Sequence, residues 1–254
     1  MLTYLKHALH NLMNTHKLFD RYISTHFGYT HSPEEIQREY KVRRRYFRKN
    51  YASHLPKNKN ARIVDAGCGM GDFLFFLQRE GYTNFLGVDI STEVVSFCQK
   101  QGFATEQHDL HSFFHDRRNE FDAIVFNDII EHLTKDVIVE LLEKMFVALR
   151  PGGVLCIKTP NMSNWMTAAG GRYIDFTHEI GFTQESLSQV ARLAGFSDVT
   201  VYGLAIYVFY ENPLNYPAWL LSMLIQSYML ITTRLYGRKT TTIFSKDILV
   251  ICKK

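Results

Sequence analysis

The residue types best suited to chemistry lie in and around a glycine-rich loop. The segment IVDAGCGMG follows an apolar run and spaces Gly67, Gly69 and Gly71 as GxGxG. A phosphate-binding P-loop needs GxxxxGK followed by Ser or Thr, and a dinucleotide-binding turn needs GxGxxG, so the loop matches neither pattern. Asp65 precedes the glycines, where negative charge disfavours a phosphate. Asp89 follows about twenty residues later, where a carboxylate accepts both hydroxyls of a ribose. The loop therefore suits a nucleoside that carries a cationic amino acid.

A second group of polar residues follows an apolar strand pattern. The segment FNDIIEHL contains Asn127, Asp128, Glu131 and His132, and the last three are spaced i, i+3 and i+4. One helical turn would present those three on one face. Carboxylates and imidazoles remove protons, and they also bind divalent metals. We expect proton transfer to take place at this turn.

The segment 160–182 joins two predicted elements and has no helix or strand pattern of its own. A connection of this length in a compact domain is usually functional. It delivers Asp175 and His178, and we expect Gly170 and Gly171 to make it mobile. We interpret it as an active-site lid.

Strands and helices alternate from Ala61 onwards, and this alternation must position the residues above. Strands are predicted at 61–67, 84–90, 104–109, 121–128, 154–160, 198–205 and 247–254. Helices are predicted at 71–81, 91–102, 136–150 and 183–195. The pattern predicts an α/β fold with a doubly wound parallel sheet, whose ligand lies at the carboxyl ends of the strands. The glycine loop follows the first strand and falls at that edge.

A helix start precedes the alternating region. Ser32 is a predicted N-cap, Pro33 occupies the first turn, and Glu35 completes a capping box. Seven basic residues follow between Arg38 and Lys49. We interpret them as the solvated face of a helix whose aromatic residues pack inward, although such a run also suits a polyanion.

The motifs after residue 60 resemble those of the class I S-adenosylmethionine-dependent methyltransferases, over roughly residues 60–205 and the final strand. VDAGCGMG is similar to their first motif, FLGVDIS to the second, FDAIVFNDIIEHL to the fourth and LRPGGVLCI to the fifth. The resemblance implies a Rossmann-like, seven-stranded sheet with the last strand antiparallel. The chain then divides into an N-terminal helical cap at 1–60 and a methyltransferase domain at 61–254.

The same resemblance implies that S-adenosylmethionine is the cofactor. Asp65 would take its ammonium group and Asp89 its ribose, and Asp109 and Leu110 in the segment QHDL would flank its adenine. The expected cofactor-binding residues are Asp65, Gly67, Gly69, Asp89, Ile90, Asp109, Leu110 and Asn127.

One branch of this family suggests a metal. In the small-RNA 3′-end 2′-O-methyltransferases a Glu-x-x-Glu-His turn and a later histidine bind one divalent ion, and some ubiquinone-biosynthesis O-methyltransferases have a comparable turn. By position the ligands here would be Asp128, Glu131, His132 and His178, with Asp128 departing from the usual Glu. Without a metal, His178 acts as general base or pairs with Asp175. In either case we expect His178, His132 and Asp128 to be the catalytic residues.

The stretch between Glu211 and Arg234 contains no charged residue, and PAWLLSMLIQSYMLITTRLYG predicts a helix at 217–237. It forms a helical insert at about 211–237, before the last strand. Its apolar part is too short to span a bilayer. Peripheral membrane contact, a homodimer seam and packing on the domain's own sheet remain as its roles.

The insert resembles that of methyltransferases found with bacterial glycan and lipid-linked sugar biosynthesis. This favours O-methylation of a saccharide or a lipid-linked precursor, a small-molecule acceptor class for which a sugar-binding set lies in the lid: Asn161, Asn164, Trp165, Arg172 and Tyr173. A quinone or other phenol is an alternative acceptor, and a non-catalytic cofactor-binding module is a further alternative. An RNA 2′-O-methyltransferase is also considered, but a nucleic-acid partner is disfavoured because no separate RNA-binding domain is present.

The composition and the cysteines indicate where in the cell the protein is expected. The net charge of +4 and the pI near 8.8 are only mildly basic. Four cysteines are widely spaced without a CxxC pair, which is typical of reduced thiols, and the first residues contain no apolar stretch of a secretory signal. We expect a cytoplasmic protein, peripheral at the inner face of the membrane if the insert binds lipid.

Overall fold

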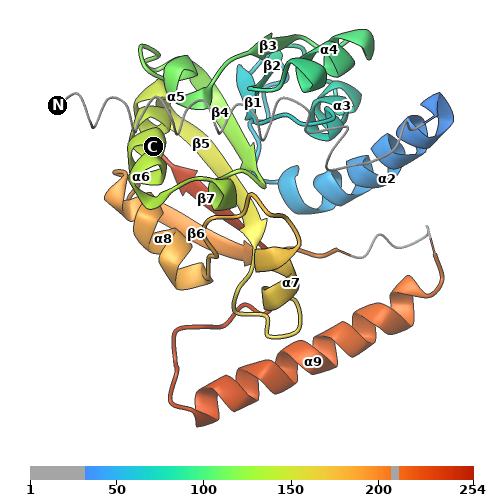
Figure 1. Cartoon of the computed structure of the whole chain (residues 1–254), viewed down its shortest axis with the longest axis vertical. Coiled ribbons are helices and arrows are strands. Elements are labelled where there is room, and N and C mark those ends of the chain that lie inside the picture. Colours follow the sequence, from blue (N-terminus) through green and yellow to red (C-terminus); the bar gives the residue numbers. More distant parts are fainter. Residues whose placement is uncertain (1–31, 207–211) are drawn as a thin grey trace.

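A computed structural model describes residues 32–206 and 212–254 (Figure 1). The predicted helical region at 1–31 and Glu211, where the predicted insert begins, lie outside the described residues. The remainder of the predicted N-terminal cap is a single helix, α2 (Pro33–Tyr51), followed by a short loop into the sheet.

The centre of the fold is a seven-stranded sheet in the order β3-β2-β1-β4-β5-β7-β6. Its strands are β1 (Ile63–Ala66), β2 (Phe85–Asp89), β3 (Thr105–Gln107), β4 (Phe121–Asn127), β5 (Leu149–Pro160), β6 (Asp198–Gly203) and β7 (Asp247–Lys253). The strands β1 to β5 pair in parallel, and β7 runs antiparallel to both β5 and β6. The predicted Rossmann-like α/β fold with an antiparallel last strand is confirmed.

Helices cover both faces of this sheet. The helices of the domain are α3 (Asp72–Arg79), α4 (Thr92–Lys100), α5 (Leu110–Phe113), α6 (Lys135–Ala148), α7 (Ala168–Tyr173) and α8 (Gln184–Leu193), with a short 3₁₀ helix η2 (Ile130–His132). Helix α9 (Asn215–Leu235) does not cover the sheet but runs apart from it (Figure 1). Neighbouring strand residues face opposite sides. Val64 packs with α6 and α8 on one face, whereas Ile63 packs with α2 and α3 on the other.

The start of α2 is as predicted. Ser32 Oγ accepts a hydrogen bond from the backbone of Glu35, whose carboxylate accepts one from the backbone of Ser32, so the capping box is complete. Tyr40 and Phe47 are buried against α3, and the basic residues lie on the outer side. This helix therefore carries aromatic residues to the sheet, and its tyrosine hydroxyls reach the candidate site described below.

Two predicted elements differ from the structure. The predicted lid is not without secondary structure, because α7 runs through it and Gly171 donates a helical hydrogen bond to the carbonyl of Thr167. Gly170 and Gly171 therefore lie inside a helix rather than in a flexible turn. The insert helix α9 begins at Asn215, two residues before Pro217, which occupies its first turn as proline favours. Among the described residues, no helix is long and apolar enough to cross a bilayer.

Candidate cofactor and catalytic site

The predicted site residues gather at one edge of the sheet, where β1, β2, β4 and β5 have their carboxyl ends (Figure 1). This is the edge at which open α/β sheets bind ligands. The glycine loop follows β1, and η2 follows β4. The lid follows β5.

The glycine loop needs glycine for two separate reasons. At Gly67 the backbone φ is +79°, and a Cβ there would lie 2.4 Å from Cδ1 of Ile129. At Gly69 the φ is +47°, but no atom lies within 4 Å of the position a Cβ would take. The first glycine is required by close packing, and the second leaves an open backbone surface that a ligand can approach.

Buried carboxyl groups surround this loop. Asp65 is 2% exposed, and burial together with the nearby Asp89 and Asp72 raises its pKa well above the usual range. Burial also raises the pKa of Asp72 and of Asp89. Asp72 is paired with Arg43 at 3.3 Å. A cationic ligand would stabilise the ionised form of Asp65, so the loop fits the sulfonium and ammonium charges of S-adenosylmethionine and disfavours a phosphate.

The Asp89 carboxylate is held in place by the loop itself. Its Oδ1 accepts a hydrogen bond from the backbone of Ser91 at 3.0 Å, and its Oδ2 accepts one from the backbone of Gly69 at 3.2 Å. Each carboxylate oxygen has a second lone pair, so both can still accept from a pair of ribose hydroxyls. The predicted role of Asp89 is compatible with this geometry.

The remaining predicted cofactor residues lie beside the same edge. Ile90 follows β2 and is half-buried. Asp109 is the N-cap of α5 and accepts from the backbone of Ser112 at 3.0 Å, and Leu110 packs partly against the core. Asn127 ends β4, and its Oδ1 accepts a hydrogen bond from the hydroxyl of Tyr51 at 2.7 Å.

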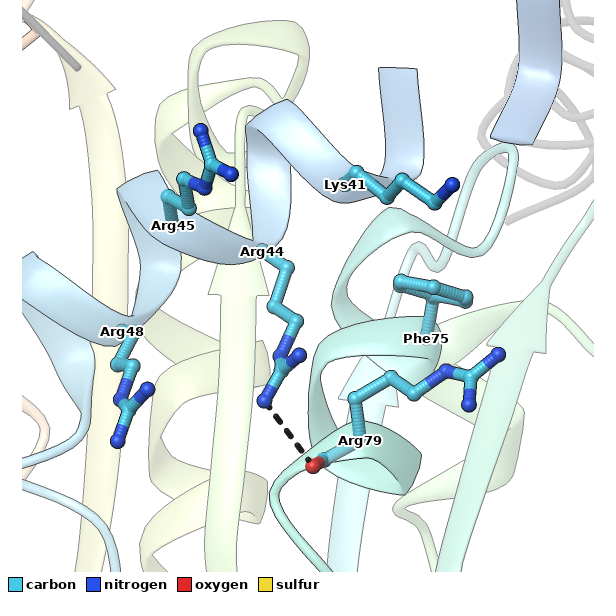
Figure 2. Close-up of a pocket in the computed structure, with 6 residues that line it drawn as sticks. All are labelled: Lys41, Arg44, Arg45, Arg48, Phe75 and Arg79. Carbon is cyan, nitrogen blue, oxygen red and sulfur yellow. Dashed lines mark hydrogen bonds between the residues drawn. The ribbon is translucent and has the colours of Figure 1, made fainter. Parts of the chain in front are cut away.

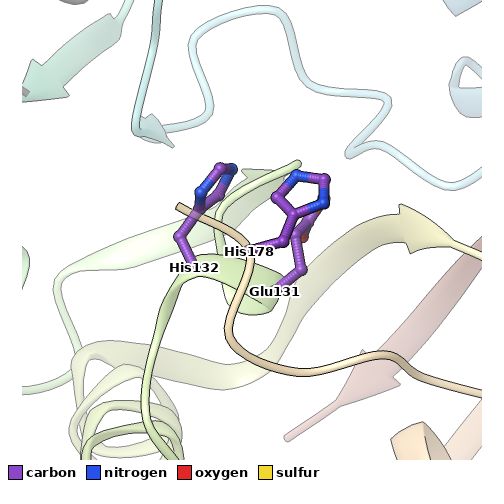
Figure 3. Close-up of side chains that lie close together, drawn as sticks. All are labelled: Glu131, His132 and His178. Carbon is purple, nitrogen blue, oxygen red and sulfur yellow. The ribbon is translucent and has the colours of Figure 1, made fainter. Parts of the chain in front are cut away.

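Glu131, His132 and His178 form the second cluster (Figure 3). One ligand atom from each of these residues lies within 4.8 Å of the others. The two imidazole rings have centroids 4.6 Å apart and are nearly perpendicular. The lid reaches η2 because the backbones of Glu179 and Ile180 donate to the carbonyl of Glu131, at 2.7 and 3.1 Å. These contacts bring together residues that are far apart in the sequence.

Hydrogen bonds fix which ring nitrogen carries the proton in each neutral imidazole. Nδ1 of His178 lies 2.7 Å from the carbonyl of Gly171, which only accepts, so Nδ1 is the donor. Nδ1 of His132 lies 2.7 Å from the hydroxyl of Thr177, which itself donates to Asp175 at 2.7 Å. When either ring is neutral, its Nε2 is then the nitrogen without a proton, which is the form of a metal ligand or a general base.

Burial shapes the charges of this cluster. Glu131 is 3% exposed, and burial, followed by the charge of Asp128, raises its pKa to about 8. Its Oε2 accepts from the hydroxyl of Thr159 at 3.1 Å. Burial, followed by the charge of His178, lowers the pKa of His132 to about 4. The imidazole of His132 is therefore neutral at pH 7. Two nitrogen donors and one carboxylate fit a divalent ion such as manganese or zinc.

The structure does not bring Asp128 into this cluster. Asp128 has a left-handed backbone, with φ of +53°, and it precedes the helical turn instead of sharing a face with Glu131 and His132. Its carboxylate forms an ion pair with Lys158 of β5. Burial opposes the charge on Lys158, but Asp128, Tyr46 and Asp247 together outweigh that effect and raise the pKa of the lysine. Of the four predicted metal ligands, three therefore lie together, and the carboxylate of Asp128 pairs with Lys158 instead.

Several lid residues predicted to bind a sugar support the lid instead. Asn161 donates to the carbonyls of Ile243 and Ser245, and Asn164 donates to that of Phe244, all within 3.0 Å. Arg172 donates to the carbonyl of His178. Trp165 and Tyr173 remain 51% and 77% exposed. Only these two of the predicted sugar-binding residues are displayed toward solvent.

The predicted solvated face of α2 lines a pocket of about 460 Å³ together with α3 (Figure 2). Its residues are Lys41, Arg44, Arg45, Arg48, Phe75 and Arg79. Arg44 donates to Glu80 at 2.9 and 3.0 Å, and Arg48 lies 3.7 Å from the same carboxylate. In Figure 2 the guanidinium groups of Arg45 and Arg48 point in different directions. The basic run therefore forms a surface with internal ion pairs rather than a converging anion site.

Three residues of the site were not predicted from the sequence. The hydroxyl of Tyr40 donates to the carbonyl of Met70 in the glycine loop at 2.6 Å, and Tyr51 reaches Asn127 as described above. Thr177 links His132 to Asp175. The inward packing of Tyr40 was predicted, but the spacing of residues does not indicate which groups the hydroxyls of Tyr40 and Tyr51 contact.

The chain is similar to known methyltransferases. A family model described as a methyltransferase domain matches residues 36–201. Phosphoethanolamine N-methyltransferase 1 of Arabidopsis thaliana is 24% identical over 160 residues, which are 59% of this chain and 32% of that protein. Trans-aconitate 2-methyltransferase of Deinococcus radiodurans is 30% identical over 110 residues, 42% of this chain and 40% of that protein. The matched region thus spans less than half of each relative's own length.

A solved structure extends the likeness to most of the fold. The crystal structure of a SAM dependent methyltransferase from Archaeoglobus fulgidus aligns with a TM-score of 0.63 and 22% identity, covering 85% of this chain and 94% of that one.

Proposed function

We propose that this chain, which belongs to the methyltransferase domain family, is an S-adenosylmethionine-dependent methyltransferase that methylates a hydroxyl group of a saccharide or lipid-linked precursor. The observation that carries the choice of a hydroxyl is a pair of imidazoles beside the buried Glu131 whose Nδ1 atoms are hydrogen-bonded to Gly171 and Thr177, which leaves each Nε2 to accept a proton. These groups lie at the same edge of the sheet as the glycine loop.

The type of acceptor decides whether a base is needed. A carboxylate is already ionised at pH 7, and a neutral amine attacks through its lone pair. An alcohol is a weak nucleophile until its proton is removed, so its methylation gains most from a positioned general base. The relatives named above act on an amine and on trans-aconitate, respectively. A cluster built for proton removal favours a hydroxyl acceptor for this chain.

In the proposed arrangement the cofactor is held by Asp65, Gly67, Gly69 and Asp89, with Ile90, Asp109, Leu110 and Asn127 around its base and ribose. When bound, it supplies an electrophilic methyl group for in-line displacement. Tyr40 and Tyr51 hold the loop and the end of β4 in place through their hydrogen bonds. The chain's task is then to align the acceptor oxygen and accept its proton.

His178 is the proposed proton acceptor. Its Nδ1–H is held by the carbonyl of Gly171 at 2.7 Å, which orients the ring and leaves Nε2 to take a proton from the acceptor hydroxyl. His132 is held through Thr177 by Asp175 and is the second candidate for the same step. Asp128 has a positioning role in this proposal, since its carboxylate pairs with Lys158.

The same donor atoms define a metal-dependent form of the proposal. Glu131, His132 and His178 would hold a divalent ion, which would supply charge to acidify the acceptor hydroxyl. The raised pKa of Glu131 favours a cation beside it, because a cation stabilises the carboxylate. Loss of turnover with chelator and recovery with Mn²⁺, Zn²⁺ or Mg²⁺ identifies this form, and turnover that is insensitive to chelator leaves His178 as the direct base.

The saccharide or lipid-linked acceptor is supported by the insert before β7 and by the exposed rings of Trp165 and Tyr173, which suit the apolar faces of sugars. A phenol such as a quinol is the second candidate, and the exposed apolar side chains of α9 favour it equally. The two are separated by the fraction of a host lipid extract that accepts a labelled methyl group.

The substitution His178→Ala tests the catalytic assignment. We expect turnover to fall by about a hundredfold or more, the usual contribution of a general base, while affinity for S-adenosylmethionine stays unchanged. The control is Asp65→Asn, which should weaken cofactor binding instead. Full turnover in His178→Ala would contradict the role of the histidine, and a folded wild-type protein with no cofactor binding would contradict the proposed function as a whole.

A further inference from the structure

Helix α9 displays its most apolar side to solvent. It contains 21 residues and is about 31 Å long at the usual rise per residue. One stripe along it, spaced by four, four, three and four residues, is 55–82% exposed: Leu220, Leu224, Tyr228, Ile231 and Leu235. Residues at this spacing lie on a single face of a helix. A face of this kind on a folded protein marks an interaction surface.

The opposite side of the helix is its covered side. The residue two positions before each member of the exposed stripe is half-buried or buried. Two positions correspond to a rotation of about 200° around the helix. These residues are Ala218, Ser222, Gln226, Met229 and Thr233. Gln226 donates to Ser222 at 2.9 Å, so part of this side is satisfied within the helix. Apart from Met229, the residues of the sheltered side are small or polar, and the stripe of large apolar residues lies outside, the reverse of a helix on a water-facing surface.

Charge around the helix indicates what covers the exposed stripe. Residues 212–246 contain no Asp or Glu, and their charged residues are all basic: Arg234, Arg238, Lys239 and Lys246. The first three flank the carboxyl end of the exposed stripe and are themselves exposed. A second copy of the helix would bring like charges together and offer no acid to pair with them. A bilayer with anionic headgroups offers both an apolar interior and the complementary charge.

The lid adds apolar side chains of the same kind. Tyr173, Ile174 and Phe176 are 77%, 81% and 93% exposed, immediately before Thr177 and His178. In Figure 1, α7, which carries the start of this stretch, lies on the side of the domain along which α9 runs. The loop that holds the catalytic histidine and the helix therefore share a side of the molecule.

From these observations we propose that α9 binds the surface of an anionic lipid bilayer. Its Leu220–Leu235 stripe enters the acyl region, and the cations at its carboxyl end lie among the headgroups. This rests on the proposed function only in explaining how a lipid-linked acceptor reaches the lid, because binding to vesicles requires neither an acceptor nor methyl transfer. Failure of one is therefore measured separately from failure of the other.

The chain offers its own reporter for this binding. It has two tryptophans, Trp165 in the lid and Trp219 on α9. In Trp165→Phe the emission comes from α9 alone. Titration with vesicles of phosphatidylcholine and phosphatidylglycerol should shift this emission to shorter wavelength and raise it. Vesicles of phosphatidylcholine alone should bind more weakly, since the anionic headgroups contribute.

Matched substitutions identify the surface. In the Trp165→Phe background, Leu224→Glu on the exposed stripe should weaken vesicle binding by about tenfold or more, because it removes a buried apolar group and places a charge there. Leu193→Glu is the control, since Leu193 of α8 is 63% exposed, close to the 61% of Leu224. Cofactor binding by each variant verifies its fold. The proposal would be overturned if anionic vesicles left the emission unchanged, or if the two variants lost vesicle binding equally. It would also be overturned if the protein formed a dimer that Leu224→Glu dissociates and bound no vesicles.

Discussion

Replacing Gly67 by alanine tests the packing of the cofactor loop at a single atom. The added Cβ would lie 2.4 Å from Cδ1 and 2.5 Å from Cγ1 of Ile129, far inside an ordinary carbon–carbon contact. The residue would also keep a φ of +79°, which an L-residue adopts at a cost of about 1–2 kcal/mol. Overpacking adds about 1–3 kcal/mol. We therefore expect Gly67→Ala to lower the free energy of unfolding by about 2–5 kcal/mol.

Gly69→Ala is the matched control. It also imposes a positive φ, of +47°, but no atom lies within 4 Å of its Cβ position. Its loss in unfolding free energy should be limited to the backbone part, about 1–2 kcal/mol. Urea unfolding of both variants measures this difference, and calorimetry with S-adenosylmethionine reports whether the loop still accepts its ligand.

A double-mutant cycle separates the collision from the backbone strain. Ile129→Ala removes both colliding atoms and leaves a Cβ at 3.7 Å, which is an ordinary contact. Gly67→Ala combined with Ile129→Ala should then be less destabilised than the sum of the single variants, by about 1–3 kcal/mol. The same combination with Gly69→Ala should be additive. Equal losses for the two glycine variants, or no coupling to Ile129, would refute the reasoning.

Three further predictions each concern a single side chain. Between the ordinary pKa of an aspartate and the raised pKa of Asp65, the unliganded fold holds a proton that both the unfolded chain and the cofactor-bound state release. As pH rises through that window, the stability of the unliganded protein should fall and its affinity for the cofactor should rise. Asp65→Asn should flatten both pH dependences, which urea unfolding and calorimetry measure. Unchanged slopes in this variant would contradict a raised pKa of Asp65. Tyr51→Phe removes the bond to Asn127 and should cost about 1–2 kcal/mol in urea unfolding, whereas a neutral effect would mean the amide finds another donor. Ser32→Ala breaks the capping box of α2 and should cost about 1 kcal/mol in the same assay, with Ser32→Asn retaining most of the stability.

The sheet was predictable because its strands and helices carry local signals. The central strands are apolar runs bounded by glycines and capping residues, and alternating strands and helices leave few ways to arrange them. The position of the glycine loop at the end of β1 follows from this arrangement. The sequence therefore predicts where the candidate cofactor residues lie, and the structure places them at that edge of the sheet.

The proton-handling cluster was predicted only in part, because long-range contacts decide its membership. Glu131, His132 and His178 come together through backbone hydrogen bonds between the lid and η2. Asp128 matches the expected spacing, but its positive φ places it outside the helical turn. Its carboxylate forms an ion pair with Lys158, which lies thirty positions away in the sequence. Neither feature has a local signature.

The secondary structure of the lid was mispredicted for a similar reason. Gly170 and Gly171 favour a flexible loop in isolation. In the fold they form part of α7, which is held by the hydrogen bond from Arg172 to the carbonyl of His178. Asn161 and Asn164 bind backbone carbonyls some eighty residues further along, so their amides support the lid rather than a sugar.

Methyl transfer to a hydroxyl is tested most directly by following a labelled methyl group. Wild-type protein and His178→Ala are incubated with methyl-labelled S-adenosylmethionine and host extract, which is then separated into glycolipid, quinone, RNA and small-molecule fractions. We expect the wild-type protein to place label in the glycolipid fraction as an ether that survives mild alkali, and His178→Ala to place almost none there. Label released by alkali as an ester, or label found on an amine or in RNA, would contradict the account.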